Sequence, residues 1–176
     1  MNTLAVPTKR LGTSREARKL AQRMFSEATR RSRAPVFFTA LAVPDTMDGR
    51  FDLFTLHAWL VLDCLAGWSD RLSQAFVDEV FLSFEEALRQ LGTADVGMTR
   101  RLKTLGNAFY GRLEAYRKSR DVSELAQALA RNVYRGDDAR AVEAHALATY
   151  VWSARSHLAK AKIGEGALDF GPIPSG

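Results

Sequence analysis

Apolar residues recur along this chain with the 3.6-residue period of amphipathic α-helices. The first periodic stretch begins after the capping-box pattern Thr13–Glu16, Thr-Ser-Arg-Glu. Pro35 disfavours helical geometry at the residue before it, so we expect this helix to end near Arg33. No stretch alternates apolar and polar residues as a half-buried strand would. The pattern predicts an all-α fold, a single-domain bundle of six or seven helices.

Later apolar lines locate the other helices, which we expect near residues 35–41, 51–68, 69–91, 98–116, 121–133 and 138–160. The helix over 51–68 is apolar on most of its circumference, which is typical of a helix at the centre of its bundle. Its only polar stripe, at spacings of three and four, consists of Asp52, Thr55, Trp59 and Asp63. His57 lies on the apolar side, where a core histidine with one hydrogen bond is favoured over a ligand.

A polar turn is expected before the central helix, between Pro44 and Phe51. Asp48-Gly49 is a turn signal, because Gly49 is able to adopt a positive φ. Charged hydrogen bonds hold such a loop in shape, so we expect Asp45, Asp48 and Arg50 mainly to fix the entry into the central helix. Direct contact of these three residues with a client or partner is the alternative.

Two glycines, Gly106 and Gly111, fall inside the helix expected near residues 98–116. Each costs about 1 kcal/mol relative to alanine in a helix interior. A compensating feature is therefore expected, either the close approach of another helix or space left for a ligand. Close packing is the favoured explanation.

The net charge of +5 is concentrated in the first part of the chain. Residues 1–33 hold nine Lys and Arg against two Glu, and the remaining residues are slightly acidic in sum. We therefore divide the chain into a basic arm with an amphipathic helix at 1–33, a helical body at 34–162 and a flexible tail at 163–176. A folded helix is favoured over a transit peptide for the arm, because of its glutamates and its capping box.

The outer face of the arm helix is basic and carries Arg15, Lys19, Arg23 and Arg30. A localised basic surface attracts phosphate groups and anionic lipid headgroups. We therefore expect these four residues to face a membrane or a ribosome, and a solvated helix face is the alternative.

Motifs that carry chemistry are missing from the sequence. It contains no GxxxxGK[ST], GxGxxG, HExxH, CxxC or GxSxG pattern, and its single cysteine excludes an intramolecular disulfide. Acid pairs such as Asp78-Glu79 lie on helix faces, and their setting does not suggest the paired carboxyl groups of acid/base catalysis. We therefore expect no enzyme, no metal site and no cofactor. The basic cluster around Arg101 and Lys103 has no alternating aromatic residues, so specific DNA binding is not expected either.

Three segments resemble the ubiquinol–cytochrome c chaperone family: PVFFTALAVPDTMDGRFDLFTLHAWLVL, LGTADVGMTRRLKTLGNAFYGR and ALARNVY. They occur in the family's order and spacing, and the resemblance covers about residues 34–150. Ala42 departs from the family, which commonly has glycine before this Val-Pro. The short extension before residue 34 looks more like that of a bacterial member than of a mitochondrial precursor.

The resemblance implies a non-enzymatic assembly factor that binds newly made cytochrome b before it enters the ubiquinol–cytochrome c reductase complex. Mitochondrial members act with a second assembly protein near the ribosomal exit tunnel. A bacterial member would be cytoplasmic and a eukaryotic one would lie on the matrix side, with peripheral contact at the inner membrane as a further option. The alternative function is a lipid- or ribosome-associated binding module that acts through the basic arm.

A chaperone of this kind needs an apolar groove that covers a hydrophobic client segment, as in helix-in-groove recognition. We expect Trp59 and Tyr110 to contribute to this client surface, since Trp59 lies on a polar stripe and Tyr110 lies about 100° from the apolar line of its helix. Ordinary core or rim positions are the alternative for both aromatic residues. Arg101 and Lys103 are further candidates for client or partner contact.

Overall fold

The structure is a computed structural model that describes residues 13–93, 95–161, 163–165 and 167–174. Every regular element in these ranges is helical, which confirms the all-α prediction. The α-helices are α1 (Ser14–Ser32), α2 (Val36–Thr39), α3 (Met47–Leu65), α4 (Asp70–Gln90), α5 (Asp95–Lys118), α6 (Val122–Asn132) and α7 (Ala141–Leu158). Two short 3-10 helices, η1 (Asp138–Arg140) and η2 (Ile163–Glu165), flank α7.

Side-chain caps set the starts of several helices where the sequence indicates them. The Thr13 amide donates to Glu16 Oε2 at 2.7 Å, and the Glu16 amide donates to Thr13 Oγ1 at 3.3 Å, so the capping box is present. Ser69 accepts from the Leu72 amide at the start of α4. Asp121 caps α6 in the same way. Each cap satisfies a backbone donor that the helix itself leaves free.

The entry into α3 differs from the predicted turn. Thr46 Oγ1 accepts a hydrogen bond from the Gly49 amide, so the helix already begins at Met47. Gly49 does not adopt the positive φ predicted for it. A β-carbon at this position would lie 1.9 Å from the carbonyl oxygen of Pro44. Gly49 is therefore required by a close backbone approach, and the left-handed conformation occurs instead at Ala42, with φ 49°.

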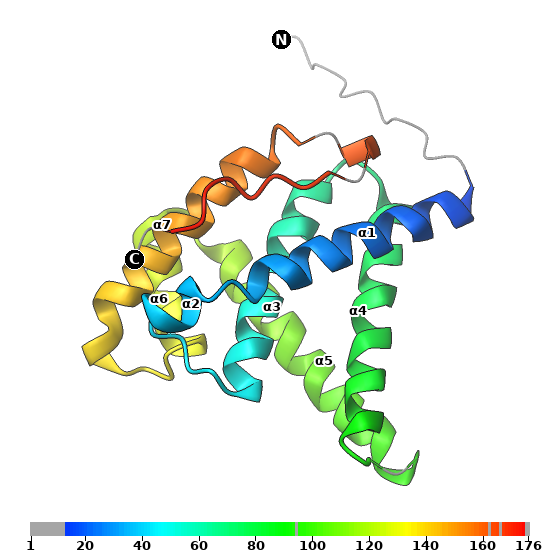
Figure 1. Ribbon diagram of the computed structural model, residues 1–176, viewed down its shortest axis with the longest axis horizontal. Coiled ribbons are helices and arrows are strands. Elements are labelled where there is room, and N and C mark those ends of the chain that lie inside the picture. Colours follow the sequence, from blue (N-terminus) through cyan, green and yellow to red (C-terminus); the bar gives the residue numbers. More distant parts are fainter. Residues whose placement is uncertain (1–12, 94, 162, 166, 175–176) are drawn as a thin grey trace.

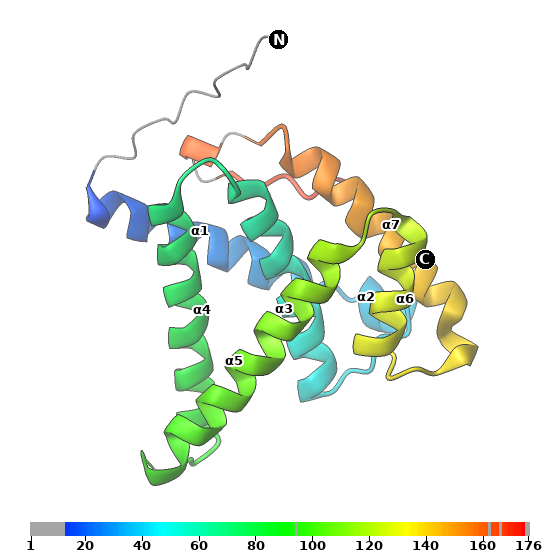
Figure 2. The same ribbon diagram turned by 180° about the vertical axis from the view of Figure 1, so that it is seen from behind.

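Helix α3 packs against α1, α4, α5 and α7 (Figures 1 and 2). Buried residues occur on all sides of it, and they include the polar residues Asp52, Thr55 and His57. The stripe that the sequence marks as polar is thus enclosed by neighbouring helices. Its charges require partners inside the protein.

Helix α1 crosses α3 and α4 and packs against both (Figure 1). Its buried side chains, among them Leu20 and Met24, belong to the same core cluster as α3. Phe170, in the segment predicted as a flexible tail, is buried in that cluster as well. The division at residues 33 and 162 stays a prediction, and in the structure the core extends across both boundaries.

Helices α4 and α5 pack against each other and converge at the bottom of Figure 1. Both helices also contact α3, which connects the α4–α5 pair to the rest of the bundle. In the part of the chain that the structure describes, no helix combines the length and the apolar character needed to cross a membrane.

Candidate functional site

Seven aromatic rings from four helices form one cluster where α1, α3, α4 and α5 meet. They are Phe25, Phe51, Phe54, Phe81, Phe84, Phe109 and Tyr110. Centroids of neighbouring rings lie 5.4 to 6.3 Å apart, the range of favourable tilted and edge-to-face pairs. Phe84 and Phe109 are buried at the centre of the cluster, whereas the others are partly or largely exposed.

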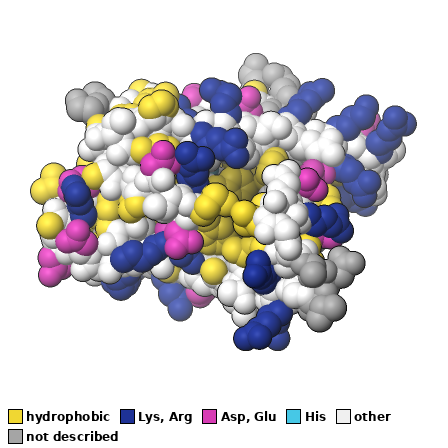
Figure 3. All heavy atoms as spheres, turned by 60° about the horizontal axis from the view of Figure 1, so that its bottom comes forward, with side chains coloured by type: hydrophobic (Ala, Val, Ile, Leu, Met, Phe, Trp, Pro, Cys, Tyr) yellow, Lys and Arg dark blue, Asp and Glu magenta, His cyan; other side chains and the backbone are white. Residues whose placement is uncertain are grey.

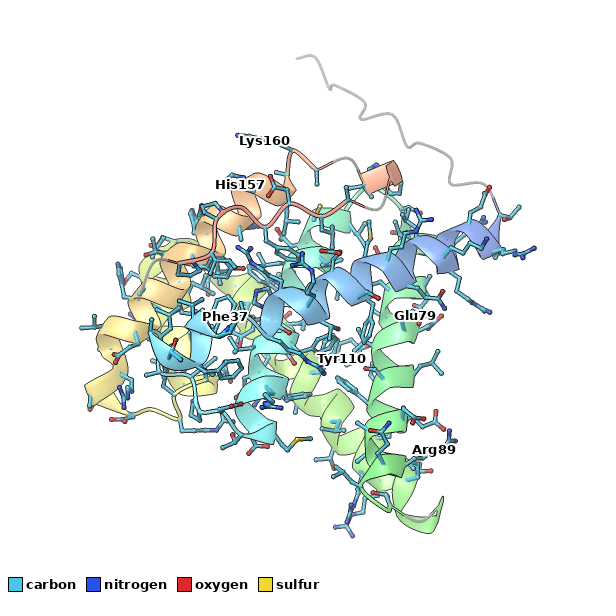
Figure 4. All side chains as sticks on the ribbon, viewed as in Figure 1. Phe37, Glu79, Arg89, Tyr110, His157 and Lys160 are labelled. Atoms are coloured by element: carbon cyan, nitrogen blue, oxygen red, sulfur yellow. The ribbon has the colours of Figure 1, made fainter. Side chains whose placement is uncertain are left out.

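The surface is hollowed on the side of the molecule where α3, α4 and α5 lie (Figure 3), and these helices carry most of the exposed rings of the cluster. Figure 3 shows apolar side chains lining a recess in the face that looks onto α3, α4 and α5, with charged side chains around it. Tyr110, on α5, is 50% exposed, and in the view of Figure 4 it appears between α3 and α4. We call Phe25, Phe51, Phe54, Phe81 and Tyr110 the aromatic hollow. A contiguous apolar surface with a polar rim is typical of an interaction site.

Tyr110 therefore occupies the exposed position that a client-contacting residue needs. Its ring packs against Phe81 at 5.9 Å and Phe109 at 5.4 Å, which holds an exposed aromatic side chain in a defined orientation. Lys103 is exposed two helical turns earlier, on the same side of α5 by its spacing. Arg101 is exposed too, but its Nη1 donates to Thr93 Oγ1 at 2.8 Å. Contact of any of these residues with a client stays a prediction.

Trp59 lies elsewhere, in the core. It is 4% exposed, its ring meets that of Tyr116 edge-on at 5.8 Å, and the Arg155 guanidinium lies 5.7 Å from its centroid. The prediction that Trp59 contributes to an exposed client surface is therefore corrected, and the alternative of a core aromatic holds. The helical projection of α3 marks this side as polar, but α5 and α7 cover it.

The polar stripe of α3 forms a seam of ion pairs with residues of neighbouring elements. Asp52 is fully buried, and its two carboxylate oxygens lie 2.7 Å from Arg112 Nε and 2.7 Å from Arg135 Nη2. Burial raises the pKa of the Asp52 carboxyl, and the two arginines oppose that shift. Further along α3, Asp63 accepts two hydrogen bonds from Arg155, at 2.6 and 3.0 Å. These pairs attach α5, the residues after α6, and α7 to α3.

The seam also supports the aromatic hollow. The Arg112 guanidinium lies 5.1 Å from the centroid of the Phe51 ring while its Nε binds Asp52. A cation held over an aromatic face is favourable, and here the buried carboxylate fixes the position of the cation. Arg112 thus connects the ion pairs inside the bundle with an aromatic side chain at its surface.

The loop before α3 contains the charged hydrogen bond that the sequence predicts. Arg50 Nε donates to Asp45 Oδ1 at 2.7 Å, and this bond lowers the pKa of the Asp45 carboxyl. Asp48 is exposed in the first turn of α3, where a negative charge favours the helix dipole. The predicted charged hydrogen bond is thus present between Asp45 and Arg50, and their role in fixing the entry into α3 stays a prediction. Contact of the three residues with a partner stays a prediction.

The predicted basic residues of α1 form part of its exposed side. Arg15, Lys19 and Arg23 succeed one another at intervals of four, and all three are exposed. Arg30 is exposed as well and pairs with Glu27 at 2.6 Å. In Figure 3, Lys and Arg side chains gather at the edge of the molecule where α1 begins. Their contact with a membrane or a ribosome stays a prediction.

His57 is a core histidine, as predicted, with hydrogen bonds at both ring nitrogens. Its Nδ1 lies 2.7 Å from the Leu53 carbonyl, which only accepts, so Nδ1 carries the proton. Its Nε2 accepts from the Tyr150 hydroxyl at 2.9 Å. Burial and, to a smaller extent, the positive charge of Arg31 lower the pKa of His57 to about 4. Among the described residues, no cluster of His, Cys, Asp and Glu is arranged to hold a metal ion.

Sequence reasoning missed most of the aromatic hollow. Phe81 directly follows Val80, a position of the predicted apolar line of α4, so one of the two neighbours had to face away from that line. Phe51 and Phe54 belong to a helix that is apolar around most of its circumference. In both helices the sequence shows more apolar residues than one buried face needs. It does not show whether another helix or a binding partner covers the additional ones.

Comparisons with known proteins agree on one family. A family model described as ubiquinol-cytochrome C chaperone matches residues 39–164, which contain α3 to α7. The crystal structure of the Cbp3 homolog from Brucella abortus is similar, with a TM-score of 0.75 and 31% sequence identity, covering 88% of this chain and 90% of that chain. A search of curated proteins finds no match. The chain therefore belongs to the ubiquinol-cytochrome c chaperone family, as its sequence motifs indicate.

Proposed function

We propose that the protein is a non-enzymatic assembly factor of the ubiquinol–cytochrome c reductase complex and that it binds newly made cytochrome b. Family membership supports the assembly role. The aromatic hollow is the observation that carries the binding role, because it offers exposed apolar surface on a rigid helical frame. The hollow would cover an apolar segment of cytochrome b until that segment reaches its place in the complex.

The energetics favour such a contact. Cytochrome b segments are apolar, and apolar surface in water costs roughly 25 cal/mol for each Å² exposed. A helix that lays its apolar side into a groove removes that surface from water on both partners. The rings of the hollow support one another and pack on buried Phe84 through tilted and edge-to-face contacts, so little side-chain freedom is lost on binding. The charged side chains around the hollow (Figure 3) stay in contact with water and keep the complex in solution.

Site-specific crosslinking tests this surface. A photoreactive side chain at Tyr110 or at Phe81 should crosslink to newly made cytochrome b. Val142 on α7 is the matched control, since it is an apolar residue that is 79% exposed and lies outside the hollow. Equal crosslinking from all three positions would place the client surface elsewhere.

A genetic experiment separates the assembly role from the location of the site. Deleting the gene should lower both cytochrome b and the assembled complex, and the wild-type protein should restore them. Tyr110→Lys should fail to restore them although it folds, since Tyr110 is half exposed. Normal cytochrome b and normal complex after deletion would contradict the assembly role. Full restoration by Tyr110→Lys would contradict only the assignment of the hollow.

The exposed basic side of α1 supports a second candidate function, binding to an anionic membrane surface or to ribosomal RNA. Arg15, Lys19 and Arg23 present three charges in a row, and each well-placed charge near anionic lipid contributes on the order of 1 kcal/mol. Reversing all three to Glu should abolish salt-sensitive binding to anionic vesicles or to ribosomes. Unchanged binding would contradict this candidate. A second assembly protein, which the family resemblance implies, is a further proposed partner.

A further inference from the structure

Residues 167–174 cross the surface of the bundle as an extended segment, which we call the strap. Figure 1 shows it in red, running along α7. Leu168 packs against the core and Phe170 is buried, with 5% of its surface exposed. The Phe170 ring meets the His57 ring edge-on at 5.5 Å. The strap therefore inserts one aromatic side chain into the bundle without being part of a helix.

A single arginine holds the backbone of the strap. Arg31 Nη2 on α1 donates to the carbonyl oxygens of Gly171 at 2.7 Å and Pro172 at 2.8 Å, and approaches that of Phe170 at 3.5 Å. Arg31 Nε donates to the Tyr150 hydroxyl at 2.9 Å, and this hydroxyl donates in turn to His57 Nε2. The guanidinium is thus held in place by buried groups of α7 and α3. It recognises backbone carbonyls, which every peptide has.

Backbone conformation and steric contact restrict the residue at position 171, directly after Phe170. Gly171 has φ 69°, and a β-carbon there would lie 2.6 Å from the His157 ring. The Asp169 carboxylate accepts from the Gly171 amide at 2.8 Å and lies 3.3 Å from His157 Nδ1. The site under the strap thus accepts an extended peptide in which an aromatic residue precedes glycine.

We propose that this site, formed by Arg31, His57, Tyr150 and His157, is a peptide-binding site that the strap occupies in cis. Its ligand in trans is an extended segment of another polypeptide that carries an aromatic residue followed by glycine. Two features support the replacement of the strap by a segment of another polypeptide. The contacts made by Arg31 are to backbone atoms, and the strap is held by side chains of other elements. The site is separate from the aromatic hollow, so it does not depend on the proposed binding of cytochrome b.

Displacing the strap in the full-length protein tests the proposal. Gly171→Ala should eject it, because the new β-carbon meets the His157 ring while the residues of the site stay unchanged. Gly111→Ala is the matched control, since it is also a glycine-to-alanine change and nothing lies within 4 Å of the added carbon. The probe is a fluorescent peptide with the strap sequence Ala-Leu-Asp-Phe-Gly-Pro-Ile-Pro, and its binding is followed by fluorescence anisotropy.

The peptide should bind the Gly171→Ala protein at least about tenfold more tightly than the Gly111→Ala protein, because a tethered segment competes at a high effective concentration. A peptide with alanine in place of phenylalanine should not bind either protein. Equal affinity for the two proteins, or no binding to a folded Gly171→Ala protein, overturns the proposal. Phe170→Ala provides a second way to release the strap, and failure of both variants to fold also overturns it.

Discussion

At Ala42 the backbone adopts the left-handed conformation between α2 and α3, with φ 49°. A hydrogen bond from the Val43 amide to the Phe37 carbonyl, at 3.0 Å, closes the turn that contains Ala42. An L-residue pays about 1–2 kcal/mol for this conformation, whereas glycine adopts it freely. The glycine that the family resemblance led us to expect before Val43 would adopt this conformation without strain.

Ala42→Gly should stabilise the protein by roughly 0.5–1 kcal/mol, because the relief of backbone strain exceeds the extra freedom that glycine has in the unfolded chain. Urea denaturation measures the change. Ala40→Gly is the control, since Ala40 is exposed and has an ordinary φ of −95°. Ala40→Gly should lower the stability. A loss of stability in both variants would mean that the strain at Ala42 is negligible.

His57 makes folding dependent on pH. The unfolded chain binds a proton at this ring below about pH 6.5, whereas burial lowers the pKa in the folded protein to about 4. Between these values the unfolded state holds more protons, so the free energy of unfolding rises with pH. The contribution is complete above pH 6.5 and is lost as pH falls to about 4, and it amounts to roughly 3 kcal/mol.

Urea denaturation of the wild type and of His57→Gln between pH 7.5 and 4.5 isolates this contribution, because the acidic residues titrate in both proteins. The wild type should lose more stability than the variant as pH falls. Parallel curves for the two proteins would contradict a neutral, buried His57.

At the scale of single elements, α5 shows how the two predicted helix glycines differ. A β-carbon on Gly106 would lie 3.1 and 3.2 Å from two atoms of the Phe81 ring, so the favoured explanation of close packing is confirmed there. Around Gly111 nothing lies within 4 Å, and the residue is exposed. Only the first glycine therefore has a packing role, in which it lets an aromatic ring of α4 lie directly on α5.

Gly111→Ala should stabilise the protein by about 0.5–1 kcal/mol, the difference in helix propensity at an exposed interior position. Gly106→Ala should gain less or lose stability, since the Phe81 ring has to move by a few tenths of an ångström. Thermal denaturation of the two variants side by side makes the comparison. A larger gain at Gly106 than at Gly111 would contradict the packing role.

At the scale of the whole molecule, α1 and the strap complete the core from opposite ends of the chain. Helix α1 has a basic outer face and an apolar inner face, and the inner face packs on α3 and α4. Arg31 at its end then binds the strap. The same helix thus supplies core residues and exposed positive charge, and these two roles respond differently to mutation.

Removing residues 1–33 should abolish cooperative unfolding, because it removes buried Leu20 and Met24 together with Arg31. Reversal of Arg15, Lys19 and Arg23 to Glu should leave the melting temperature nearly unchanged, since these side chains are exposed. Circular dichroism melts measure both changes. Cooperative unfolding of the truncated protein would show that the helix is a dispensable arm.

The sequence by itself determined most of the helices, the caps at Thr13, Ser69 and Asp121, the apolar lines and the concentration of positive charge, because these depend on neighbours within a few residues. It also indicated the family through motifs that the comparisons confirm. The candidate site was only partly predictable. Tyr110 was found, whereas Phe51, Phe54 and Phe81 were not.

Only the tertiary structure decided which surfaces are covered. Asp52 pairs with Arg112, 60 residues away, and Asp63 with Arg155, 92 residues away, so the stripe that holds Trp59 turns inward. The strap likewise returns to Arg31 across 140 residues. A helical projection shows which side of a helix is polar, but whether that side meets water or a buried cation depends on residues distant in sequence.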